Sequence, residues 1–142
     1  MPLHIIKLAV GAESVEDMQA WIDRRVKERK AAGERAVSWH ETRMFPKRAD
    51  EVLDGGSLYW VIKHFILVRQ PILGLEEAVD SEGKPLCRIV LAPKLVRTEP
   101  RGKRPFQGWR YLTANDAPAD LDQKKAELSP ALVSALKDAL AW

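Results

Sequence analysis

The chain has 142 residues, of which 23 are lysine or arginine and 20 are aspartate or glutamate, and its net charge is +3. This length suits one domain with its own apolar core, so we expect a single domain over residues 1–142. Hydrophobic residues make up 46% of the chain, and no apolar run approaches the roughly 18–20 residues of a membrane span. These observations exclude a mainly disordered chain and a membrane helix. The single cysteine allows no internal disulfide and favours a cytoplasmic protein of bacterial type.

The N-terminal third alternates strand and helix patterns. Apolar side chains at every second position of residues 4–10 predict a strand. Ser14 is a suitable N-cap, and the apolar stripe that follows at spacings of three and four predicts a helix that ends near Gly33. Residues 37–44 are expected to form an unusually polar strand, and residues 46–54 a short helix.

The middle of the chain has the composition of β-structure. Strands are expected over residues 58–63, 72–76, 86–92, 94–98 and 106–112, and residues 65–69 are expected either to continue the first of these or to form another strand. Proline cannot donate a ladder hydrogen bond, so we expect an edge, a bulge or a bend at Pro71. Residues 99–105 are rich in proline, glycine and basic residues and predict a loop.

A last helix is expected near the C-terminus. Ser129 and Pro130 fit the start of a helix, and its apolar stripe consists of Leu132, Leu136 and Leu140. Helices at both ends of a run of strands predict the α+β class, with a curved, mostly antiparallel sheet or a small, partly open barrel. The N-terminal, the central short and the C-terminal helix would flank this sheet.

Basic residues concentrate between Lys94 and Arg110, where six of them stand against one acidic residue, Glu99, whereas residues 113–142 carry a net charge of −2. A basic stretch interleaved with aromatic residues is typical of surfaces that bind RNA or nucleotides, although it also fits a solvated basic loop. The residues expected to bind such an anionic ligand are Arg43, Lys47, Arg48, Tyr59, Trp60, Lys63, Arg69, Arg101, Lys103, Arg104, Trp109 and Arg110.

Two groups of these residues have specific expected roles. Arg43 ends a strand, and Lys47 and Arg48 open a helix, where backbone amides and cations favour phosphate. The alternative is that these cations pair with acidic residues three or four positions away. Tyr59 and Trp60 point to opposite faces of a strand, so one is expected in the core and the other exposed for stacking.

The polar strand around His40 supports a rival hypothesis, a small enzyme that acts on a nucleotide or a modified base. His40 or Glu41 would be the acid or base and Arg43 the anion clamp, although neighbouring strand residues face opposite ways. The histidines lack metal-ligand spacing, so neither a metal nor a cofactor is expected. Cys87 is expected to be a buried, inert thiol. A third alternative is a protein-interaction or homodimer module that uses the last helix.

Several strings of residues are distinctive: His4–Leu8, Thr42–Met44 with Pro46–Glu51, Leu53–Lys63, Arg69–Gln70 and Arg104–Leu112. Together they resemble a bacterial family of conserved domains of unknown function. The resemblance covers nearly the whole chain, and it implies a small stand-alone cytoplasmic protein and no particular activity. The succession of a short helix, a glycine and a strand run is similar in architecture to the PUA/ASCH group of RNA-binding-like barrels. This second resemblance implies a basic or polar cleft beside the short helix, although Gly56–Lys63 does not reproduce the ASCH signature.

Overall fold

The structure, a computed structural model, describes residues 2–121. Its elements are β1 (His4–Leu8), α1 (Val15–Ala31), β2 (Ser38–Thr42), α2 (Ala49–Leu53), β3 (Ser57–Ile62), β4 (Phe65–Val79), β5 (Pro85–Leu91), β6 (Val96–Gly102) and β7 (Trp109–Leu112). The predicted C-terminal helix lies outside the described residues. Within residues 2–121, no helix has both the length and the apolar character needed to cross a membrane.

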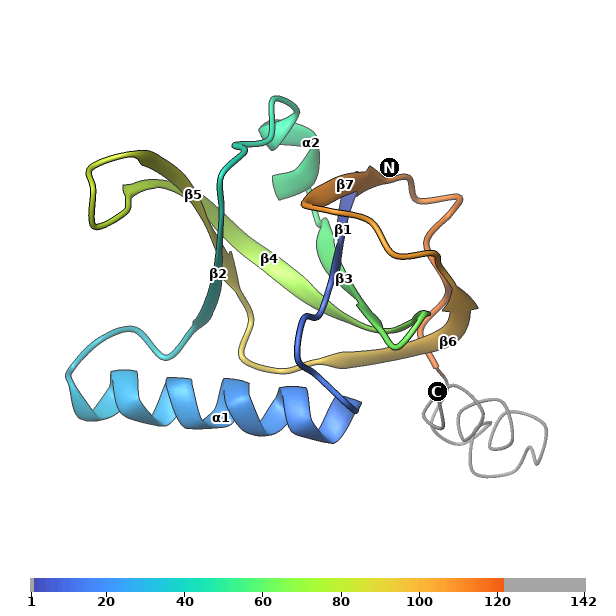
Figure 1. The fold of residues 1–142 in the computed structure, drawn as a ribbon, viewed down its shortest axis with the longest axis horizontal. Helices are drawn as coiled ribbons and strands as arrows, with labels where there is room; N and C mark the ends of the chain where they lie inside the picture. The colour runs from blue at the N-terminus through green and yellow to red at the C-terminus, as the bar shows by residue number, and fades with distance from the viewer. Residues whose placement is uncertain (1, 122–142) are drawn as a thin grey trace.

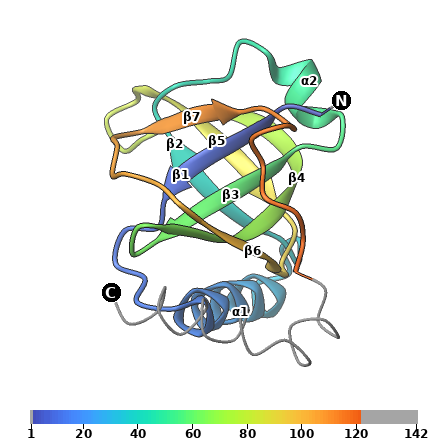
Figure 2. The same cartoon turned by 90° about the vertical axis from the view of Figure 1, so that its right-hand side faces the viewer.

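The strands form one mixed sheet in the order β2-β5-β4-β3-β1-β7, and β6 pairs with β4. The β1–β3 pair is parallel, whereas the other pairs found among residues 2–121 are antiparallel. Figure 2 shows that the sheet curves strongly, and Figure 1 shows α1 lying across one end of it. The architecture is therefore α+β with a curved sheet that does not close, because β2 and β7 end the path of paired strands.

β4 is a single strand of 15 residues, where the sequence predicted two strands separated at Pro71. The first half of β4 pairs with β3 as far as Pro71, and the second half pairs with β5 from Ile72 onward. The missing N–H of Pro71 thus falls where one ladder ends and the next begins. The predicted bulge is also present, because the β4–β5 register shifts between Ile72 and Gly74 and leaves Leu73 as an extra residue.

β6 extends through a segment that the sequence predicted as a loop. The strand continues to Gly102, so the predicted boundary at residue 98 was wrong. Pro100 is tolerated because the pairing with β4 is irregular: Arg97 pairs with Val68 and Arg101 with Ile66, and the residues between them bulge out of the ladder.

Both faces of β3 are buried, which corrects the expectation that either Tyr59 or Trp60 would be exposed. Their relative exposures are 4% and 5%. Trp60 belongs to the main core together with Met18 and Ile22 of α1, whereas Tyr59 belongs to a smaller core on the other face that includes Phe106. Neither ring is therefore available on an open surface for stacking.

Candidate functional site

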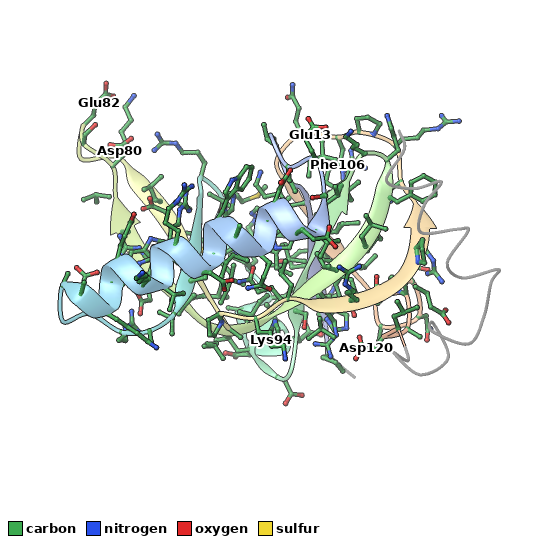
Figure 3. The ribbon with its side chains drawn as sticks, turned by 90° about the horizontal axis from the view of Figure 1, so that it is seen from below. Glu13, Asp80, Glu82, Lys94, Phe106 and Asp120 are labelled. Atoms are coloured by element: carbon green, nitrogen blue, oxygen red, sulfur yellow. The ribbon has the colours of Figure 1, made fainter. Side chains whose placement is uncertain are left out.

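Four of the cations that the sequence predicted as ligand-binding make ion pairs within the protein. Their nitrogen–oxygen distances are 2.7 Å for Arg43–Asp80, 2.5 Å for Arg48–Glu51, 2.6 Å for Lys63–Glu13 and 2.7 Å for Arg69–Asp120. Figure 3 shows Asp80 and Asp120 at opposite ends of the molecule. Because Arg43 and Arg69 are tied to these two carboxylates, the structure does not bring them together on one phosphate.

The other predicted residues are spread over loops and strand ends. Arg101 and Trp109 donate hydrogen bonds to the backbone carbonyls of Asp116 and Met44, and the Trp109 side chain is buried. The guanidinium of Arg110 lies 4.8 Å from the centre of a neighbouring ring, Phe106. The predicted cations without an ion pair within residues 2–121 are Lys47, Arg101, Lys103, Arg104 and Arg110.

α2 does not provide the predicted anion site at a helix N-terminus. It has five residues and begins at Ala49, so Lys47 precedes it and Arg48 occupies its N-cap position. The backbone N–H of Arg48 donates to the hydroxyl of Tyr111 at 3.1 Å, and its side chain is paired with Glu51. A helix this short has a weak dipole, and one of its amides is already used.

The structure has a pocket of about 240 Å³ between α1, β1 and β2. Residues of β3, β4 and β5 complete its lining. Figure 1 shows β1 and β2 on the side of the sheet next to α1. The side chains that give the pocket its chemical character are Lys7 of β1, Trp21 and Arg25 of α1, Trp39 and His40 of β2, and Trp60 of β3. Three of the five tryptophans of the chain therefore meet here, and Trp60 is the one member of the sequence-predicted set that lines this pocket.

The aromatic part of the pocket combines a fixed ring with an accessible one. The Trp60 indole N–H donates to Oε1 of Gln70 at 3.2 Å, and Nε2 of Gln70 donates to the Ala92 carbonyl at 2.7 Å. These two bonds orient a ring that packing already holds in the core. Trp21 is 37% exposed and offers a ring that a ligand can reach.

The pocket contains two cations and no acidic residue. Lys7 is a half-buried residue of β1, and Arg25 is an exposed residue of α1. Neither makes an ion pair with any residue between positions 2 and 121, in contrast to Arg43 and Arg69. Two positive charges that lack a carboxylate partner and share a partly enclosed space favour an anionic ligand.

His40 contributes a neutral imidazole to this site. Burial, and then the charges of Lys7 and Arg25, lower its pKa to about 4. Its ring meets the Trp60 ring edge-on with centroids 5.2 Å apart, and its Nε2 is buried without a hydrogen-bond partner in the described part of the chain. At neutral pH this imidazole is uncharged, so it can donate one hydrogen bond and accept another without repelling the nearby cations.

The proposed catalytic trio of His40, Glu41 and Arg43 does not assemble around the pocket. Glu41 is exposed, does not line the pocket, and lies 3.6 Å from a guanidinium nitrogen of Arg88. Arg43 reaches Asp80 instead. His40 alone of the three lines the pocket.

The remaining reactive groups are accounted for by burial. Cys87 is buried as predicted, and burial raises the pKa of its thiol to about 11. Nδ1 of His4 accepts a hydrogen bond from the Ser57 backbone N–H at 2.9 Å. Among the described residues, no group of three or more histidine, cysteine or acidic side chains is placed to hold a metal ion.

Several pocket residues were missed by the sequence analysis although the sequence contained a signal for them. Lys7 is the one polar residue among positions 5–10. Trp21 and Arg25 are four residues apart and therefore share a helix face. Trp39 is next to His40 in the polar strand that the sequence analysis considered for catalysis, so an aromatic side chain near a titratable one was visible in the sequence.

The fold and the pocket define an α+β protein with a basic, tryptophan-lined pocket between α1 and its curved sheet. A family described as "Protein of unknown function (DUF1489)" matches residues 5–142, and the chain belongs to that family. This match confirms the resemblance to a family of unknown function. Neither a curated protein nor a solved structure matches the chain.

Proposed function

We propose that the protein binds a nucleotide-like anion, either free or as one unit of RNA, in the pocket between α1, β1 and β2. The observation that carries this proposal is that one pocket combines two cations with three indole rings. The cations, Lys7 and Arg25, make no ion pair within residues 2–121. A nucleotide has the complementary chemistry, because it joins a planar ring to a phosphate. Binding of this kind needs no chemical step, so the proposed role is recognition without turnover.

The size of the pocket limits what can enter it. Pockets for drug-sized ligands occupy roughly 300–1,000 Å³, and this one measures about 240 Å³. It suits one heterocyclic ring with its immediate substituent and not a base pair. In the proposed arrangement the ring stacks on Trp21 and the phosphate lies between Lys7 and Arg25.

Neutral polar groups in the wall are suited to contact the edge of the ring. Ser38 is a buried residue that lines the pocket, and its hydroxyl makes no hydrogen bond with any residue between positions 2 and 121. His40 stands beside it on β2 as a neutral imidazole. A donor and an acceptor at one end of an aromatic slot favour a ring that contains nitrogen over a plain hydrocarbon ring.

The proposal has three wider elements. We propose that the open, curved sheet is a PUA-like partial barrel and that binding occurs in the cytoplasm. The cations of the Arg101–Arg104 segment remain a predicted second basic surface for the same class of ligand. A homodimer or protein-interaction role would use the apolar stripe of the last helix, which lies outside the described residues.

Calorimetric titration of uridine and adenosine 5′-monophosphate at low salt tests the proposal. Arg25→Gln and Lys7→Met are each expected to weaken binding by about tenfold or more, because a charge-assisted hydrogen bond contributes roughly 1.5–3 kcal/mol. Arg24→Gln is the matched control, since Arg24 is exposed on the same helix and does not line the pocket.

Two outcomes would contradict the proposal. One is the absence of nucleotide binding at low salt, and the other is an equal loss of affinity in Arg24→Gln and Arg25→Gln. Lys7→Met adds a readout that does not depend on the ligand. Because Lys7 shares the pocket with a second cation and makes no ion pair among residues 2–121, its removal is expected to maintain or raise the free energy of unfolding while binding is lost.

A further inference from the structure

Two arginines next to the pocket are held on one tryptophan. The guanidinium carbon of Arg29 lies 3.3 Å from the centroid of the Trp39 ring, and that of Arg88 lies 4.7 Å from it. Arg29 also donates to the Val37 carbonyl at 2.7 Å. These contacts fix the position of both guanidinium groups, so they form a rigid basic surface instead of two mobile side chains. We call Arg29, Arg88 and Trp39 the arginine ridge.

The charge of the arginine ridge is only partly compensated. The nearest carboxylate oxygen of Glu41 is 3.6 Å from Arg88, and the buried Nε of Arg88 has no hydrogen-bond partner among the described residues. Arg29 makes no ion pair within residues 2–121. Burial, and then the charge of Arg25, lower the pKa of Arg29; Glu34 and Glu28 raise it, and Arg88 lowers it further. The charges of Arg25 and Arg88 therefore both repel that of Arg29, and nearby glutamates offset this only in part.

The arginine ridge continues from the pocket. Trp39 and Arg25 both line the pocket, and Arg29 follows Arg25 by four residues of α1, or about 6 Å along the helix axis. Figure 1 shows the start of β2 next to this part of α1. A row of cations that extends from a pocket for one heterocyclic ring matches the successive phosphates of an extended polynucleotide.

We propose that the nucleotide in the pocket is one unit of a single-stranded nucleic acid, and that Arg29 and Arg88 hold the phosphates of neighbouring units. This inference rests on the proposed function and adds the form of the ligand. A single strand is required because the pocket admits one ring and not a base pair, so the base must be free of its stack. Arg29 and Arg88 would contact phosphates of neighbouring units, which a free mononucleotide does not have.

Affinities of mononucleotides and of pentanucleotides with the same base test this inference. The probes are uridine and adenosine 5′-monophosphate and the corresponding RNA and DNA pentanucleotides, each titrated at several salt concentrations. The wild-type protein is expected to bind a pentanucleotide at least about tenfold more tightly than the mononucleotide. Arg29→Gln and Arg88→Gln are expected to remove most of this gain, to lower the slope of log affinity against log salt by about 0.7 each, and to leave mononucleotide affinity within about twofold.

Matched variants separate the role of charge from damage to the fold. Lys27→Gln removes a charge from an exposed position of the same helix and is expected to change neither affinity. Arg29→Lys and Arg88→Lys retain the charge, so they are expected to retain the salt slope even where stacking on Trp39 is weaker. Circular dichroism identifies any variant that fails to fold. If a glutamine variant fails to fold, the corresponding lysine variant is compared with the wild-type protein instead.

The outcomes distinguish this inference from the proposed function. If mononucleotides bind and pentanucleotides bind no more tightly, or if Lys27→Gln matches Arg29→Gln, the ridge inference is wrong and the pocket proposal stands. If neither ligand binds at low salt, the proposed function itself fails. A glutamate decapeptide that binds as tightly as the pentanucleotide, with the same dependence on Arg29 and Arg88, would show a site for acidic peptides and would also overturn the inference. Preference for RNA or for DNA pentanucleotides then identifies which polynucleotide is bound.

Discussion

The neutral state of His40 makes a quantitative prediction about stability. In the folded protein its pKa is about 4, whereas an exposed histidine in the unfolded chain has a pKa near 6.5. As the pH falls below 6.5, His40 binds a proton in the unfolded state but stays neutral in the folded state. The free energy of unfolding therefore decreases. At ~1.36 kcal/mol per pKa unit, the full loss is roughly 3 kcal/mol once the pH falls to about 4.

The experiment compares the wild-type protein with His40→Gln, which removes the titrating group. Urea unfolding is followed by far-ultraviolet circular dichroism between about pH 7.5 and about pH 5. Over this range His40 contributes a loss of about 2 kcal/mol in the wild type and nothing in the variant. The other titrating groups are common to both proteins, so the difference between the two pH profiles isolates His40.

Parallel pH profiles would refute this reasoning, because they would show that His40 titrates at the same pH in the folded and the unfolded state. A constant offset between the profiles does not matter, since it measures only the cost of the substitution at neutral pH. Lys7→Met provides a second check on the cause. Burial is the larger cause of the low pKa and the Lys7 charge is a smaller one, so this variant is expected to retain most of the loss.

Two further predictions concern the core. Gly56→Ala is expected to cost roughly 3 kcal/mol of stability, because a Cβ there would lie 2.3 Å and 2.4 Å from the carbonyl oxygens of Val52 and Leu3. Gly102→Ala, where the nearest atom is 4.0 Å away, is the control, and equal unfolding midpoints in urea would contradict the steric argument. Cys87, with its pKa of about 11, is expected to resist a thiol reagent at about pH 8 until urea unfolds the protein; rapid labelling of the folded protein would contradict its burial.

The sequence predicted most of the helices and strands, but it missed how strands change partners. The apolar periodicity of α1 and the β-branched residues of β5 identify these elements directly. β4 was divided because proline is expected to interrupt a ladder. That expectation depends on a single partner strand, whereas β4 passes from β3 to β5 at Pro71, and this exchange is a property of the sheet that a local pattern does not contain.

The error at Tyr59 and Trp60 has a different physical origin. The prediction assumed one wet face, as in many antiparallel sheets. All six residues of β3 are buried, and a continuous apolar run is the pattern of a strand covered on both faces. β3 also pairs in parallel with β1, which places it in the interior of the sheet. The run from Leu58 to Ile62 was therefore a usable signal.

The candidate site was harder to predict because cations are neutralised by acidic residues that lie far away in the sequence. Arg43 forms an ion pair with Asp80 on the β4–β5 hairpin, and Arg69 forms one with Asp120 beyond β7. A count of local charge cannot anticipate such pairs. The same limit hid the pocket, whose cations come from β1 and α1 and whose histidine comes from β2, so that each appears isolated in the sequence.

The contrast between these two sets of cations is the strongest argument for the pocket. Arg43 and Arg69 have carboxylate partners, so their charges are explained by the folded chain alone. Lys7 and Arg25 line the pocket without an ion-pair partner among residues 2–121, and after burial their charges are the further causes of the low pKa of His40. A charged side chain that makes no ion pair in the described part of the chain and lies beside an exposed aromatic ring does not stabilise the fold through its charge. Binding of a ligand explains such a charge better. The arginine ridge extends the same reasoning, because its repulsion would be relieved by the phosphates of a bound strand.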